Sequence, residues 1–317
     1  MMSTTLGRGA MWVFCCAMAC SSSEASSPAS GGGEQDSGLT GDAEVLDGNV
    51  VDPDSGVAVA ASDLRFKRFK SAASYQTKFA QVSGSQLTAT VKAFGDEGFV
   101  ITAATTNTAG YTFIGYKDPG GPTAYETKLD QVLGSGLTAS VAAFGTEGFT
   151  ITAALTNTAG YTLVGFKDAK AAKKTTTTFE QVLGSGLQGA VASLAAKGNV
   201  VAGATANDAG YTLFGTQVAG TAATYEATFE QVQGSELVAT NTSLATRGFT
   251  VTAATTNTAG YTLFAFKDPA ATKVTARLEQ VSGSDLEQTV TSFASQGFVI
   301  TAAVTNTSGY TLLGVKR

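Results

Sequence analysis

The chain contains no histidine, and its three cysteines, Cys15, Cys16 and Cys20, all lie within the first 20 of its 317 residues. Zinc sites built from Cys and His are therefore excluded from the rest of the chain. A nucleophilic Ser or Thr also lacks the His that normally takes its proton. We therefore expect no catalytic residue, no metal site and no cofactor, and a protein that is not an enzyme.

Charge is also scarce, because Asp, Glu, Lys and Arg make up 14% of the residues and the net charge is -5. Only one basic cluster occurs, and it consists of Arg65, Lys67, Arg68 and Lys70. Nucleic-acid binding needs many Lys and Arg side chains to neutralise phosphates. We therefore expect no nucleic-acid partner.

Long apolar runs are missing too. The apolar stretch after Arg8, residues 10–19, has ten residues, whereas a membrane-spanning helix needs about 20. A short apolar run behind a basic residue is typical of a signal peptide. We therefore interpret residues 1–19 as a signal peptide.

The residues around the end of this segment, Ala17-Met18-Ala19-Cys20, resemble a bacterial lipobox, although Leu or Val is more usual at the first position. The resemblance implies that Cys20 carries a lipid and that the protein is held at the bacterial outer membrane or cell surface. Its partner would then be the membrane, through the N-terminal lipid. Cleavage after an Ala-x-Ala sequence is the alternative and would give a soluble periplasmic protein.

Two further segments precede the main part of the chain. Residues 20–56 are rich in Ser, Gly and acidic residues, a composition that favours a disordered tether. Residues 57–74 are predicted to form a degenerate capping hairpin. We expect its basic cluster to mark a charged strand edge that discourages aggregation, with binding to an anionic surface as the alternative.

The dominant feature of the sequence is an internal repeat. A glutamine recurs at steps of 50, 50, 50 and 49 residues, at Gln81, Gln131, Gln181, Gln231 and Gln280. A Gly-Tyr pair recurs with the same steps. We therefore divide the chain into repeats 1–5, which span residues 75–122, 123–172, 173–222, 223–272 and 273–317.

The first half of a repeat predicts a strand and a helix, as repeat 2 shows. Residues 125–132 alternate in polarity, which indicates a half-buried strand. Leu137, Val141 and Phe144 then form one apolar helical face. Ser135 lies where a helix N-cap is expected. The equivalent serines, all predicted to be N-caps, are Ser85, Ser135, Ser185, Ser235 and Ser284.

The second half of a repeat predicts a hairpin. Gly148 lies where a left-handed residue ends the helix. Residues 149–153 and 161–167 are predicted strands, joined by a turn at residues 156–160. On the second strands, alternation predicts that a threonine faces outward, at Thr102, Thr152, Thr252 and Thr301. The fold class is therefore α+β, with five tandem βαββ repeats.

Each repeat of about 50 residues is too small to be stable alone, so neighbouring repeats must share a core. Five copies at a nearly constant period resemble five-fold α/β-propeller folds, which implies a closed ring. An open stacked array is the alternative. The enzymes known on such propellers use Cys and His, which these repeats lack.

The repeats also resemble a small bacterial domain family of unknown function, in which a strand and helix lead to Glu-Gly-Trp and two further strands end in Lys-Arg. The corresponding residues here are Glu97-Gly98-Phe99, Glu147-Gly148-Phe149 and Lys316-Arg317. Phe replaces Trp, and repeats 3–5 lack the Glu. The resemblance implies no activity.

The hairpins carry the candidate binding residues. They are Asn107, Tyr111, Asn157, Tyr161, Asn207, Tyr211, Asn257, Tyr261, Asn306 and Tyr310. Asn caps its own turn readily, and a Tyr at the start of a strand often packs in the core. The functional alternative is a set of similar loops that contact a carbohydrate or an envelope protein.

Three hypotheses for the function remain. The first is a non-catalytic, lipid-anchored protein of the bacterial cell envelope that acts as a binding or adhesion scaffold. The second is a purely structural envelope lipoprotein. The third is a carboxylate-dependent hydrolase that uses Glu97, Glu147, Glu180, Glu230 or Glu279. Recurring carboxylates on separate repeats are expected to lie farther apart than the ~5–10 Å of glycoside hydrolases.

Overall fold

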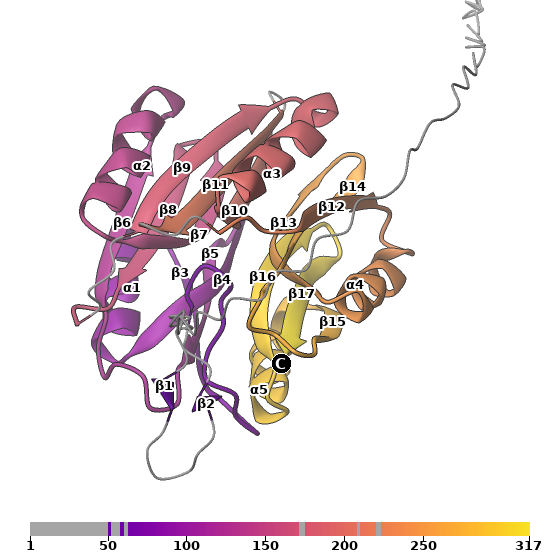
Figure 1. The fold of residues 1–317 in the computed structure, drawn as a ribbon. Helices are drawn as coiled ribbons and strands as arrows, with labels where there is room; N and C mark the ends of the chain where they lie inside the picture. Colours follow the sequence, from indigo (N-terminus) through magenta and orange to yellow (C-terminus); the bar gives the residue numbers. More distant parts are fainter. Residues whose placement is uncertain (1–49, 52–57, 60–62, 171–174, 208–209, 220–222) are drawn as a thin grey trace, which may run out of the picture. The chain divides into compact units, whose positions relative to one another are not determined.

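The computed structural model describes residues 50–51, 58–59, 63–170, 175–207, 210–219 and 223–317. Within them the chain forms five three-stranded antiparallel sheets, each with one ten-residue α-helix (Figure 1). This confirms the α+β class and the five βαββ repeats. The predicted signal peptide, Cys20 and the tether up to residue 49 lie outside the described residues. No described helix has both the length and the apolar character needed to span a membrane.

The element bounds are nearly the same in all five repeats. The first strands are β3 (Gln76–Val82), β6 (Glu126–Val132), β9 (Thr175–Val182), β12 (Ala227–Val232) and β15 (Thr275–Val281). The helices are α1 (Leu87–Asp96), α2 (Leu137–Thr146), α3 (Leu187–Ala196), α4 (Leu237–Thr246) and α5 (Leu286–Ser295). The second strands are β4 (Phe99–Asn107), β7 (Thr150–Asn157), β10 (Val200–Asn207), β13 (Phe249–Asn257) and β16 (Val299–Asn306). The third strands are β5 (Gly110–Lys117), β8 (Gly160–Lys167), β11 (Gly210–Val218), β14 (Gly260–Lys267) and β17 (Gly309–Lys316).

The third strand of each repeat lies in the middle of its sheet. In repeat 2, β8 pairs antiparallel with β6 on one side and with β7 on the other. The sheets remain separate, since each described sheet of this kind contains strands from one repeat only. Contacts between repeats are therefore made by side chains and by single backbone hydrogen bonds.

The predicted apolar helix face packs on the sheet. Leu137, Val141 and Phe144 are at most 2% exposed. The Phe144 ring lies directly over Gly165 of β8, where an added Cβ would come within 2.6 Å of ring atoms. In repeat 4, Leu244 takes the place of Phe144 and Ala265 takes the place of Gly165, and both are buried. The smaller helix side chain thus accompanies the larger strand residue, as dense core packing requires.

The ends of the helix agree only in part with the sequence. Gly148 has φ +82°, which confirms the left-handed residue after α2. The predicted serine N-caps are wrong, because Ser135 lies inside a 3₁₀ turn, Gly134–Gly136, and α2 begins after it with Gly136 at the N-cap. The Gly136 N–H donates to the Leu133 carbonyl at 2.9 Å. A backbone carbonyl of the turn therefore accepts an N–H at the start of the helix, the role that was predicted for the serine side chain.

The threonines of the second strands do not face outward, so that prediction is wrong. Thr102, Thr152, Thr252 and Thr301 are all 0% exposed. A β-bulge interrupts the pairing between Ile101 and Ala103 and at the equivalent place in every repeat. A bulge inserts an unpaired residue and breaks the two-residue alternation. Thr102, Thr252 and Thr301 instead donate to a carbonyl of the adjoining repeat, as in the hydrogen bond from Thr252 Oγ1 to the Val201 carbonyl at 2.5 Å.

The segment before repeat 1 forms two small antiparallel features. β1 (Val50–Val51) pairs with β2 (Ala58–Val59), and Asp63 pairs with Arg68 across a turn. The prediction that the basic cluster marks a charged strand edge is wrong for Arg65 and Lys67, because both lie in the turn and are only 6% and 3% exposed. Arg65 Nη2 lies 2.6 Å from Asp63 Oδ2, an ion pair that compensates its burial.

Successive repeats are joined by a recurring backbone bond. The Tyr125 N–H, just before β6, donates to the Gly95 carbonyl of α1 at 2.9 Å. The Tyr75 N–H of repeat 1 donates to the Ala294 carbonyl of repeat 5, also at 2.9 Å. Thr102 Oγ1 of repeat 1 likewise donates to the Ile300 carbonyl of repeat 5 at 2.5 Å. Repeats 5 and 1 therefore contact each other through the same bonds as sequence neighbours.

Candidate functional site

The predicted hairpin asparagines lie at the ends of two-residue turns. In repeat 4, Asn257 pairs with Gly260, and Asn257 Oδ1 accepts a hydrogen bond from the Ala259 N–H at 2.9 Å. Gly260 has φ +122°, and a Cβ there would lie 2.5 Å from the Val232 carbonyl oxygen. The prediction that Asn caps its own turn is confirmed for Asn107, Asn157, Asn257 and Asn306.

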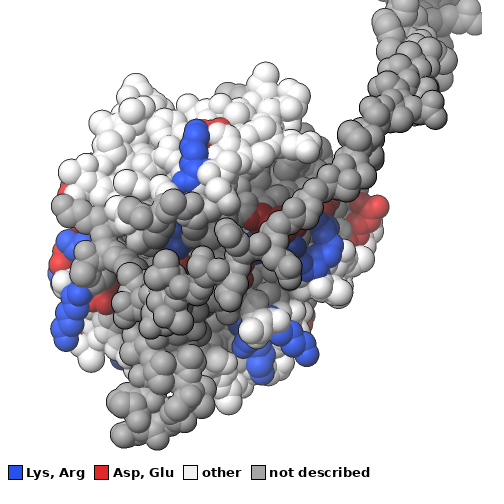
Figure 2. Space-filling model, viewed as in Figure 1, with Lys and Arg blue, Asp and Glu red and all other residues white. Residues whose placement is uncertain are grey.

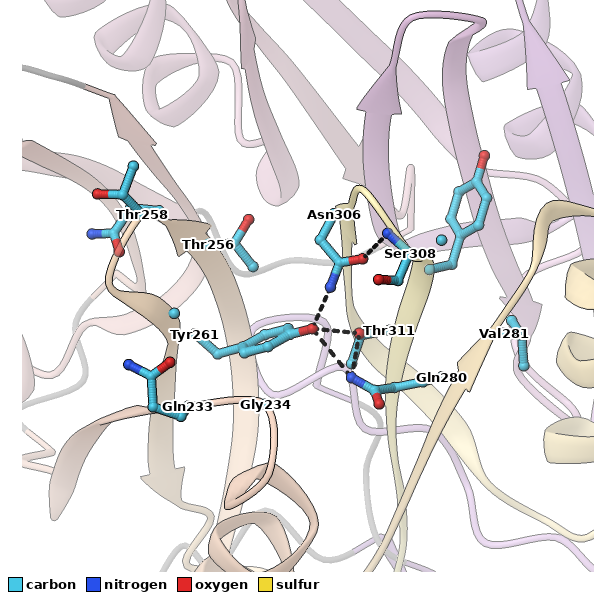
Figure 3. Close-up of a pocket in the computed structure, with 14 residues that line it drawn as sticks. Gln233, Gly234, Thr256, Thr258, Tyr261, Gln280, Val281, Asn306, Ser308 and Thr311 are labelled. Carbon is cyan, nitrogen blue, oxygen red and sulfur yellow. Dashed lines mark hydrogen bonds between the residues drawn. The ribbon is translucent and has the colours of Figure 1, made fainter.

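The same asparagine also reaches the preceding repeat. Asn306 Nδ2 donates to the Tyr261 hydroxyl at 2.6 Å, and Gln280 Nε2 donates to it at 3.2 Å (Figure 3). The hydroxyls of Tyr261 and Thr311 lie 3.2 Å apart. We call this group of one Tyr with the Gln, Asn and Thr of the following repeat a joint. Each joint links two repeats through a single phenol oxygen.

Joints recur around every Tyr that the sequence singled out. Tyr111 bonds to Gln131 and Asn157, Tyr161 to Gln181 and Thr212, Tyr211 to Gln231, Asn257 and Thr262, and Tyr310 to Gln81, Asn107 and Thr112. The last joint connects repeats 5 and 1. The five tyrosines are 5–7% exposed, whereas the asparagines and glutamines are exposed.

Sequence reasoning found the Tyr and Asn of each joint but assigned no role to the Gln and Thr. The recurrence of Gln81 and its equivalents could have identified the glutamines. The threonines, such as Thr112 and Thr311, are buried on the central strands and follow each Gly-Tyr pair directly. Thr112 and Thr311 each bond a Tyr of the adjoining repeat, and the repeat pattern does not predict how two repeats pack against each other.

The structure brings four of the predicted residues together in one cleft. A cleft of about 400 Å³ lies between repeats 4 and 5 and is lined by Asn257, Tyr261, Asn306 and Tyr310. Gln233, Thr258, Gln280 and Ser308 also line it. A second cleft of about 140 Å³ in repeat 1 contains Gln81, Asn107 and Tyr111. The predicted residues of repeats 2 and 3 line neither of these two clefts.

The larger cleft is polar but uncharged. Its lining contains amides, hydroxyls and the rings of two tyrosines, and none of its residues is Asp, Glu, Lys or Arg. On the coloured part of the face in Figure 2, Lys and Arg side chains are scattered among uncharged residues. A few placed polar groups beside an apolar surface are typical of small-molecule sites. The cleft is thus suited to a neutral ligand with many hydroxyl groups.

The recurring carboxylates have cation partners within their own repeats. Glu97 Oε1 lies 2.5 Å from Lys78 Nζ, and Glu147 Oε1 lies 2.6 Å from Lys128 Nζ. Glu180, Glu230 and Glu279 pair with Lys197, Arg247 and Arg277. Among the described residues, no group of three or more His, Cys, Asp or Glu side chains could hold a metal ion.

No protein-family model and no curated protein matches this chain. The chemistry of the described residues is therefore the basis for assigning a function.

Proposed function

We propose that this chain is an exported, non-catalytic protein of the bacterial cell envelope that binds carbohydrate through the clefts beside its hairpins. The observation that carries the proposal is the neutral cleft between repeats 4 and 5. Its amides and hydroxyls offer hydrogen-bond donors and acceptors to the hydroxyl groups of a sugar. A protein ligand of the envelope is the alternative.

We also propose that the five repeats close into a propeller-like ring. Three kinds of bond support it, because the Tyr75 N–H, Thr102 Oγ1 and the Tyr310 hydroxyl all join repeat 1 to repeat 5. The same bonds occur between sequence neighbours. In an open stacked array these groups at the two ends would have no partner. A ring also presents similar hairpins repeatedly, which strengthens binding to a polymer with repeating units.

The location rests on the N-terminal residues. A lipid on Cys20 would anchor the repeats at the outer membrane or cell surface, and the tether would hold them away from the lipid surface. Mass spectrometry of the mature N-terminus from fractionated cells tests this. A diacylglyceryl-modified Cys20 is the expected result, and an unmodified, soluble product would refute the anchor.

The carbohydrate proposal is tested with variants that block the cleft but spare the joints. Thr258→Arg and Ser308→Arg alter exposed side chains of the two hairpins that line it. We expect both to abolish binding to envelope polysaccharides on a glycan array or in a pull-down. Ala239→Arg, on an exposed site of α4, is the matched control and should bind normally.

Two outcomes would contradict the proposal. Absence of any saccharide binding by the wild-type protein would favour a purely structural lipoprotein. Hydrolysis of a substrate that is lost in Glu147→Gln or Glu230→Gln would favour the carboxylate hydrolase.

A further inference from the structure

Lys67 occupies an unusual position for a lysine. It is 3% exposed and is the only residue other than glycine with a positive φ among the described residues, at +49°. Its ammonium donates to the Thr252 carbonyl at 2.6 Å and to the Thr301 carbonyl at 2.5 Å. A strained backbone at a buried charge points to a role beyond packing.

The two carbonyls come from equivalent places in repeats 4 and 5. Thr252 and Thr301 are the bulge residues of β13 and β16. The bulge residue has no partner opposite it in its own sheet, and its carbonyl is here bonded by the lysine. Two of the three N–H groups of the ammonium are thereby used.

No anion balances this buried cation. Within the described part of the chain, Lys67 forms no ion pair with a carboxylate. On its own turn Asp63 is paired with Arg65, and Asp268 lies beside Arg68 and Arg317. Tyr75 and Arg317 line one small pocket together with Lys67. Burial lowers the pKa of Lys67 to about 7, because desolvation disfavours the charged form.

A small cavity lies against Lys67. Its volume is about 20 Å³, which is enough for one water-sized species. Small residues from all five repeats line it, namely Ala103, Ala153, Gly203, Ala253 and Ala302. At Gly203 an added Cβ would lie 2.9 Å from the Ala154 Cβ, so the lining allows little extra bulk.

A larger cavity adjoins this space. It has a volume of about 160 Å³ and shares Ala104, Ala154, Ala204, Ala254 and Ala303 with the small one. Threonines line it near the hairpin turns, at Thr106, Thr156, Thr256 and Thr305. No carboxylate lines either cavity. We call the two cavities together the Lys67 channel.

We propose that the Lys67 channel binds a small monovalent anion, of the size of chloride or of a single carboxylate group, against the Lys67 ammonium. The anion supplies the missing counter-charge and accepts the third N–H of the ammonium. The hydroxyls of Thr106, Thr256 and Thr305 donate to backbone carbonyls, so the ammonium is the donor that holds the anion. The narrow alanine lining limits the size of the anion at the lysine. This site is separate from the hairpin clefts and does not depend on carbohydrate binding.

Anion binding and protonation of Lys67 are linked. The ammonium form of Lys67 attracts the anion and the neutral amine does not. The affinity for the anion therefore falls as the pH rises above about 7, the pKa of Lys67. The other titratable groups near Lys67 are Asp63, Arg65, Arg68, Tyr75, Asp268 and Arg317. A change in affinity near neutral pH that Lys67→Met abolishes therefore reports Lys67.

The test uses the mature full chain and two readouts. Thermal unfolding is compared in sodium chloride, sodium acetate and sodium gluconate at equal ionic strength, and chloride binding is followed by the line width of ³⁵Cl NMR. We expect chloride to raise Tm relative to the bulky gluconate and to show excess broadening that weakens above pH 7. A similar effect of acetate would identify a carboxylate site, and no effect of acetate a halide site.

Three variants decide the assignment. Lys67→Met should remove the chloride effect on Tm and the excess line width. Ala104→Val, which narrows the channel but keeps the lysine, should do the same and decides the matter if Lys67→Met does not fold. Lys92→Met, on the exposed face of α1, is the control and should behave like the wild type. Chloride effects that persist in Ala104→Val, or none in the wild type, would overturn the proposal.

Discussion

Tyr310 distinguishes a closed ring from an open array, and its phenol oxygen can be removed alone. In the structure the Tyr310 hydroxyl accepts hydrogen bonds from Gln81 Nε2 at 2.9 Å and from Asn107 Nδ2 at 2.7 Å. Both donors belong to repeat 1, at the other end of the repeat series. Tyr310→Phe keeps the aromatic ring and its packing but removes the oxygen that bonds Gln81, Asn107 and Thr112.

The expected cost follows from the number of hydrogen bonds lost. Tyr310 and Thr112 are buried, but Gln81 and Asn107 are exposed, so water can reach their amides in the variant. An intramolecular hydrogen bond contributes about 0.5–1.5 kcal/mol net, so loss of the bonds from Gln81 and Asn107 should lower the free energy of unfolding by about 1–3 kcal/mol. For a chain of this size, Tm should fall by roughly 2–12 °C.

The matched variant is Tyr261→Phe, which removes the same oxygen from the joint between repeats 4 and 5. Both variants are measured by urea unfolding followed by circular dichroism. A ring predicts equal losses for the two. A full loss for Tyr261→Phe with no loss for Tyr310→Phe would refute closure, because Tyr310 would then lie at a free end.

Three further predictions follow from contacts inside the repeats and at Lys67. Gly165→Ala forces a Cβ against the Phe144 ring and should lower the free energy of unfolding in urea by about 1–3 kcal/mol. Adding Phe144→Leu should restore much of this loss. A double variant that is no more stable than Gly165→Ala would contradict this packing. In chloride-free buffer, the stability of the wild type relative to Lys67→Met should rise by up to about 1.4 kcal/mol per pH unit from pH 7 towards pH 10. The reason is that the unfolded lysine still holds its proton where the folded one, with a pKa of about 7, has lost it. Parallel pH profiles would show that burial does not lower the pKa of Lys67. Thr301→Val should lower the unfolding free energy by about 1 kcal/mol through loss of the bond to the Val251 carbonyl, and an unchanged chemical midpoint would show that the bond contributes nothing.

The features that the sequence predicted correctly depend on neighbours along the chain. The helix face of Leu137, Val141 and Phe144 follows from a 3.6-residue period, and the left-handed Gly148 follows from its place after the helix. The two-residue turns follow from Asn and Gly at fixed spacing. Local sterics decide each of these, and five copies repeat the same evidence.

The features that it missed depend on residues far apart in the chain. Alternation placed Thr102 outward because a bulge is invisible in a two-residue pattern, and the bulge turns that side chain to Ile300 in repeat 5. The basic cluster was predicted to mark a charged strand edge, yet Lys67 is buried and donates to carbonyls in repeats 4 and 5. The sequence identified only the Tyr and Asn of each joint, because each joint combines residues of two repeats.

The most direct measurement of closure is a disulfide between repeats 1 and 5. Thr105 Oγ1 and Thr305 Oγ1 lie 3.1 Å apart, a separation that places the two side chains within reach of a disulfide. The variant Thr105→Cys/Thr305→Cys, expressed from Ser21 and hence without other cysteines, is oxidised and analysed by mass spectrometry. A closed ring predicts near-complete intramolecular crosslinking in the folded monomer. Free thiols, or disulfides only between molecules, would contradict it.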